Sequence, residues 1–101
     1  METSVVVIGR GVNDRQMAYV RWQHFILDLV ELIERLGGQI YTQVQGVGYW
    51  GGGTEGLCVI SFGKADLSDA RHELARLASE YDRGCIVLII GTCELVSAWT
   101  S

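Results

Sequence analysis

The pattern of apolar and polar residues along this chain is typical of strands in some segments and of helices in others. Residues 3–8, 57–62 and 85–90 are short apolar runs rich in β-branched side chains, and residues 39–45 alternate between apolar and polar positions. These four segments predict strands. Residues 14–36 instead repeat apolar side chains every three or four positions, and so does the segment between Asp66 and Gly84, which predicts two amphipathic helices.

Residues typical of helix ends flank both expected helices. A side-chain oxygen can cap a helix start, and glycine can adopt the left-handed conformation that ends one. The expected caps and stops, in chain order, are Asn13 or Asp14, Gly37-Gly38, Asp66 or Ser68, and Gly84.

The order of the expected elements is strand, helix, strand, strand, helix, strand. Right-handed crossovers place both helices on one face of a four-stranded antiparallel sheet. We therefore expect an α+β, ferredoxin-like βαββαβ fold. The chain has no proline and no low-complexity linker, so residues 1–101 are expected to form a single domain.

The first and last expected strands predict that the sheet is covered on both faces. Residues 5–8 and 86–90 are continuously apolar, which is typical of burial on both sides. The helices cover only one face, so we expect a second copy of the chain to cover the other. The alternatives are a different protein partner or an apolar ligand. Covering roughly 400 Å² of apolar surface would contribute about 10 kcal/mol before association costs.

Composition narrows the class of protein. Hydrophobic residues make up 49% of the chain, and the formal net charge is −4. An acidic chain is not expected to bind nucleic acid. The first residues lack a signal peptide pattern, and no apolar run is long enough to span a membrane, so a cytoplasmic protein is expected. Three cysteines without a CxxC motif are expected to be reduced thiols.

Residues 46–56 contain most of the candidate chemistry. Six glycines among these eleven residues predict a loop whose backbone can approach a ligand closely. Its aromatic side chains could stack on a planar ligand, and its polar side chains could bind a ribose or a base edge. The alternative is a long β-hairpin whose aromatic residues pack on a neighbouring subunit. The candidate ligand-contacting residues are Gly48, Tyr49, Trp50, Thr54 and Glu55.

Gly9-Arg10-Gly11 forms a second candidate site, between an expected strand and helix. Free N–H groups at such a turn favour anions, and Arg10 and Arg15 would add positive charge. Residues 9–14 read G-x-G-x-x-D, with Asp14 where the dinucleotide fingerprint needs glycine or alanine. This departure excludes a Rossmann site and leaves simple phosphate contact or an ordinary turn.

No pattern in the sequence indicates catalysis or metal binding. His24 and His72 lie on expected helix surfaces without metal-ligand partners at useful spacing. Cys58 lies inside an expected strand, which is typical of a core thiol. We therefore expect no catalytic residue, no metal and no cofactor.

Two resemblances extend this interpretation. Val44-Gln45-Gly46-Val47-Gly48, followed by Gly53-Thr54-Glu55, resembles the V-x-G-x-G…G-x-T-E stretch of PII-type signalling proteins. That resemblance implies a ferredoxin-like trimer with nucleotides bound between subunits. The run from Thr54-Glu55 through residues 57–60, with the later rhythm of leucines, is similar to small accessory proteins of bacteriophages, many of them without assigned function.

Together these observations favour a non-enzymatic homo-oligomer that binds or sequesters a small, nucleotide-like ligand and is phage-encoded. One alternative is a protein-interaction module, such as a phage inhibitor of a host defence protein. Another is a small enzyme on a ferredoxin-like scaffold, with Glu55 or His72 as its acid/base residue.

Overall fold

The computed structural model describes residues 2–12, 15–50, 53–83, 86–94 and 96–97, and these form four strands and two helices. In chain order they are β1 (Glu2–Gly9), α1 (Tyr19–Arg35), β2 (Gln39–Trp50), β3 (Gly53–Gly63), α2 (Ala70–Glu80) and β4 (Val87–Thr92). The predicted βαββαβ order is confirmed.

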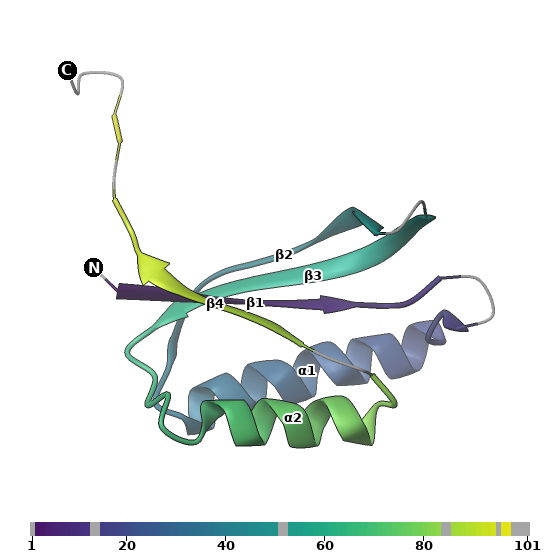
Figure 1. Cartoon of the computed structure of the whole chain (residues 1–101), viewed down its shortest axis with the longest axis horizontal. Coiled ribbons are helices and arrows are strands. Elements are labelled where there is room, and N and C mark those ends of the chain that lie inside the picture. Colours follow the sequence, from purple (N-terminus) through teal and green to yellow (C-terminus); the bar gives the residue numbers. More distant parts are fainter. Residues whose placement is uncertain (1, 13–14, 51–52, 84–85, 95, 98–101) are drawn as a thin grey trace.

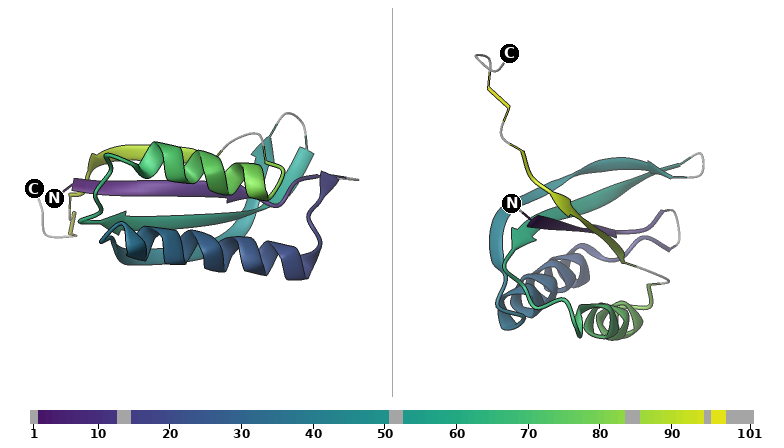
Figure 2. Two further views of the ribbon diagram at one scale, coloured as in Figure 1. Left: turned by 90° about the horizontal axis from the view of Figure 1, so that it is seen from below. Right: turned by 60° about the vertical axis from the view of Figure 1, so that its left-hand side comes forward.

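The four strands form one antiparallel sheet in the order β2-β3-β1-β4. β1 and β3 lie at its centre, while β2 and β4 are its edges. Both helices cover the same face, and the opposite face is open (Figures 1 and 2). The predicted α+β, ferredoxin-like arrangement is confirmed.

The core lies between this sheet and the helices. Side chains alternate along a strand, so every second residue of β1 and β3 faces the helices. Removing each large apolar side chain from water contributes about 1.5–3 kcal/mol. The buried apolar residues of these strands and of α1 are Val6, Ile8, Cys58, Ile60, Phe62, Trp22, Phe25, Ile26, Leu29, Leu32 and Ile33.

The end of α1 follows the prediction, and its start does not. Gly37 has φ of 80°, and the N–H groups of Gly37 and Gly38 donate to the carbonyls of Glu34 and Ile33, which is the Schellman arrangement. The helix begins at Tyr19 rather than near residue 14, because the preceding segment is bonded to the end of β1. The predicted caps at residues 13–14 lie outside the described residues.

The second helix is shorter than predicted. α2 begins at Ala70 and ends at Glu80, whereas the expected segment ran from Asp66 or Ser68 to Gly84. Asp66 accepts hydrogen bonds from the backbone N–H and the hydroxyl of Ser68, so it stabilises a turn before the helix. Gly84 lies outside the described residues.

The prediction of a loop is wrong for residues 46–50 and 53–56, which belong to a long hairpin, as the alternative predicted. The packing of its aromatic residues on a neighbouring subunit stays a prediction. β2 and β3 stay paired up to Trp50 and Gly53. Pairing across the sheet overrides the weak strand preference of the glycines. One of them is also needed for packing, because a Cβ on Gly48 would lie 2.8 Å from Cγ of Leu57.

The open face of the sheet is largely apolar. Register and alternation place Val5 and Val7 of β1 on this face, with Val59 of β3 beside Val7 and with Val87 and Ile89 of β4 on the other side. Ile89 is 53% exposed and Val87 is 37% exposed. The predicted excess of apolar residues in the first and last strands therefore lies on an uncovered surface.

The described residues that follow β4 lie away from the body of the molecule. Residues 93, 94, 96 and 97 are exposed, and this segment runs away from both helices (Figures 1 and 2). Among the described residues, no helix is long and apolar enough to cross a membrane.

Candidate functional site

The carboxylate of Glu55 is seated against the end of β1. One of its oxygens accepts a hydrogen bond of 2.7 Å from the backbone N–H of Gly11. A Cβ on Gly9 would lie 2.6 Å from the same carboxylate. Glycine at position 9 therefore makes room for this acid, and the main chain at Gly11 orients it.

The turn that orients Glu55 is bonded to both of its neighbours. The N–H of Arg10 donates to the carbonyl of Gly56 on β3, at 2.8 Å. The N–H of Met17 donates to the carbonyl of Arg10, and Arg10 Nε donates to the carbonyl of Met17, each at 2.7 Å. These bonds explain why residues 15–18 do not join α1.

Arg83, which follows α2, braces the same turn from another element. Its Nη2 donates to the carbonyl of Arg10 at 2.9 Å, and its Nη1 lies 3.5 Å from the carbonyl of Arg15. Sequence reasoning did not single out this residue. Nothing local marks an arginine at a helix end as the partner of carbonyls about 70 positions earlier, so no sequence signal could have found it.

The carboxylate lies on the open face of the sheet. Glu55 alternates in phase with Leu57 and Val59 of β3, and Leu57 pairs with Gly9. These two apolar side chains are half-buried, as is Glu55 itself. The site is thus an acid fixed at one end of an apolar surface, which can bind a substrate that has both a polar hydrogen-bond donor and an apolar part.

The predicted site residues are divided between the two faces of the sheet. Gly11, Gly48 and Glu55 come together, because Gly48 pairs with Glu55 across the hairpin. Arg10 belongs to the same turn but lies on the helix side, with its guanidinium 5.9 Å from the ring centroid of Tyr19.

The other predicted residues lie away from the carboxylate. Tyr49 is 83% exposed and pairs with Thr54, in phase with the helix side of the hairpin. Arg15 is exposed near the start of α1. Trp50 pairs with Gly53, and its side chain lies outside the described residues.

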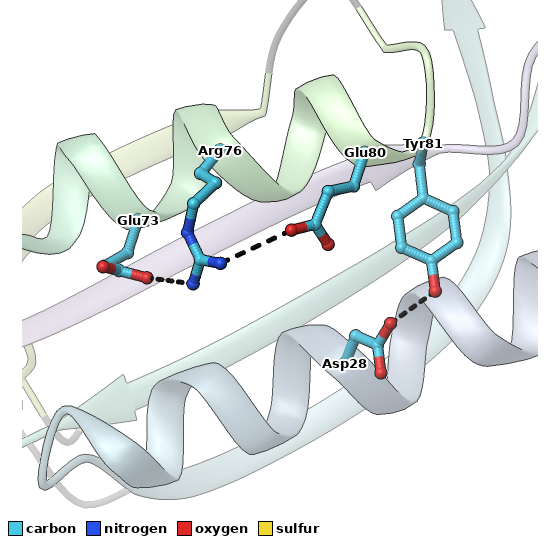
Figure 3. Close-up of polar contacts among 5 residues, drawn as sticks. All are labelled: Asp28, Glu73, Arg76, Glu80 and Tyr81. Atoms are coloured by element: carbon cyan, nitrogen blue, oxygen red, sulfur yellow. Dashed lines mark hydrogen bonds and ion pairs between the residues drawn. The ribbon is translucent and has the colours of Figure 1, made fainter.

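Several other titratable groups have structural partners or are buried. Burial raises the pKa of the Cys58 thiol to about 11, in agreement with the prediction of a core thiol. Between the helices, the Tyr81 hydroxyl donates to Asp28, while Arg76 bridges Glu73 and Glu80 (Figure 3). Within the part of the chain described, no group of three potential metal ligands occurs.

The fold of this chain is similar to that of a solved structure, but its sequence matches no known family. No family model and no curated protein matches the chain. A solved structure of a phage SAM lyase in its apo state is similar, with a TM-score of 0.54 and 14% sequence identity. The likeness covers 99% of this chain and 92% of that one, and at this identity it shows the fold alone.

This neighbour corrects one expectation and supports part of another. The expected non-enzymatic ligand-binding protein is contradicted, because the similar structure is that of an enzyme. The resemblance to phage proteins is supported only in that the similar structure is a phage protein. The resemblance to PII-type proteins is not supported.

Proposed function

We propose that this protein is an enzyme of the lyase class that acts on S-adenosylmethionine and breaks one of its carbon–sulfur bonds without water. Support comes from the likeness to the phage SAM lyase over nearly the whole of both chains. The observation that carries the proposal in this molecule is the Glu55 carboxylate, fixed beside an apolar face by Gly9 and Gly11.

The reaction dictates what Glu55 can do. When the carbon–sulfur bond breaks, its electron pair goes to sulfur, and the positive sulfonium becomes a neutral thioether. The substrate's own carboxylate oxygen bonds to the released carbon and closes a lactone ring, so no water or external base is consumed. A carboxylate paired with the sulfonium would stabilise the reactant more than the transition state and would slow the reaction. The productive role of Glu55 is therefore to accept hydrogen bonds from the ammonium or ribose hydroxyl groups and so orient the substrate.

The direct test is to incubate the purified protein with S-adenosylmethionine and follow its loss and the thioether product by mass spectrometry. We expect turnover by the wild type and a decrease in kcat/KM of about 100-fold in Glu55→Gln. Glu34→Gln, on the exposed side of α1, is the matched control and should keep full activity. No turnover by the wild type would overturn the proposal.

We also propose that a second copy of the chain covers the open face, as the continuous apolar strands predicted. Support comes from the exposed side chains of Val87 and Ile89 beside Val5 and Val7. Light scattering after size-exclusion chromatography should give a mass above that of the monomer for the wild type and a lower one for Ile89→Glu. Leu27→Glu, at an exposed leucine on α1, is the control. A monomeric wild type would contradict this assignment.

A further inference from the structure

A groove runs between α2 and the edge strand β4, on the side of the sheet that carries the helices. It encloses about 490 Å³. Its lining combines an apolar floor with two arginines and one hydroxyl: Arg71, Leu74, Ala75, Ala78, Ser79, Arg83, Ile86 and Leu88. Within the described part of the chain β4 pairs with β1 alone, so its outer edge is available for another extended segment.

The groove is basic in a protein whose formal net charge is −4. None of the described residues that line it is acidic. Arg71 is exposed and has no hydrogen bond or ion pair within the described ranges. Its neighbour on the same helix, Arg76, is paired with Glu73 and Glu80. Arg71 therefore offers an unused positive charge at an apolar groove, and the complementary occupant is an extended segment with an acid and an apolar side chain.

The chain itself carries such a segment. We call Cys93, Glu94 and Val96, which follow β4, the C-terminal arm. Glu94 is exposed and has no partner among the described residues, and Val96 is 77% exposed.

The arm cannot fill the groove of its own molecule without reversing its course, because it runs away from both helices (Figure 1). We propose that the C-terminal arm of one copy lies in the α2–β4 groove of a second copy, where Glu94 pairs with Arg71 and Val96 covers the apolar floor. Main-chain bonds to the free edge of β4 would add to the contact, as in other cases of strand addition. This interface is separate from the proposed reaction and from the open face.

Charge reversal tests the pairing. Arg71→Glu and Glu94→Arg should each weaken self-association by about tenfold, measured by sedimentation over a range of protein concentrations. The double variant should return to within about threefold of the wild type, because the pair is restored with its charges exchanged. Arg76→Glu, the same change at an arginine outside the groove, should leave association unchanged.

Cysteine cross-linking tests the position of the arm. The arm contains the exposed Cys93, so Ala75→Cys should form a disulfide between copies under mild oxidation. The control Glu34→Cys places a thiol on the exposed side of α1 and should not cross-link, and adding Cys93→Ser to the Ala75→Cys chain should abolish the product. Equal association of the wild type and Arg71→Glu, or absence of a disulfide between Cys93 and the thiol introduced at position 75, would overturn the proposal. Neither readout depends on enzymatic activity.

Discussion

At the scale of single residues, the candidate site depends on one acid and two glycines. Glu55 is held by a main-chain donor at Gly11 and fills the space where Gly9 has no side chain. The sequence suggested Glu55 and Gly11 as candidates, but for two separate ligand contacts. It could not show that they bond to each other, because they are 44 positions apart and meet only through the register of β1 with β3.

The packing of Gly9 gives a direct prediction. Gly9→Ala places a methyl group against the Glu55 carboxylate and should displace it, lowering kcat/KM toward S-adenosylmethionine by about tenfold or more. Gly46→Ala is the matched control, because a Cβ there meets nothing within 4 Å. Steady-state kinetics of the two variants checks this. Equal activity of both would show that the position of the carboxylate does not matter.

Cys58 gives a pH prediction at the same scale. Burial raises its pKa to about 11 from the ordinary value of 9.0, so the folded state holds the proton more tightly than the unfolded state. The free energy of unfolding should fall as pH rises through this interval, by up to about 2–3 kcal/mol. Urea titrations between these pH values should show a shallower decline for Cys58→Ala. An equal slope in both proteins would contradict the prediction.

At the scale of elements, the periodicity of the sequence predicted the order and the type of all six, and the buried faces of the two helices. The errors fall where long-range contacts decide the local structure. Residues 15–18 have a helical pattern, but the bonds between Arg10 and Met17 hold them outside α1. Residues 46–50 and 53–56 have the composition of a loop, but pairing keeps them in the hairpin.

The brace from Arg83 should be measurable at this scale. Arg83→Ala removes the donors to the carbonyls of Arg10 and Arg15, so the turn should open more often. We expect amide hydrogen exchange at Gly11 and Met17 to accelerate by about tenfold. Arg76→Ala removes an exposed ion pair instead and should leave both rates unchanged. Unchanged exchange in Arg83→Ala would show that the turn holds without it.

At the scale of the whole molecule, charge adds a consequence that no single residue shows. The protein has a formal net charge of −4, and the proposed substrate carries a net positive charge because its sulfonium and ammonium outweigh one carboxylate. A negative protein attracts a cation at long range, and salt screens that attraction. The same negative charge disfavours nucleic acid, as composition predicted. Composition alone did not indicate a small cationic substrate.

We therefore expect kcat/KM for S-adenosylmethionine to fall by about two- to threefold between about 20 mM and 500 mM salt. The decrease should appear in KM while kcat stays constant, since screening acts on encounter. Initial rates at matched viscosity provide the measurement. An increase of kcat/KM with salt would indicate that the substrate approaches a positively charged surface instead.

The way in which Glu55 is held also bears on how such a site can be inherited. A carboxylate oriented by a basic side chain requires that side chain to be conserved. A carboxylate oriented by a backbone N–H, as Glu55 is by Gly11, requires only that the turn keeps its shape and that Gly9 leaves space for it. Most surrounding positions are then free to drift without disturbing the acid. Searches that match residue identities would miss distant members of such a lineage, and a geometric search for a carboxylate above a strand-end glycine is the means to find them.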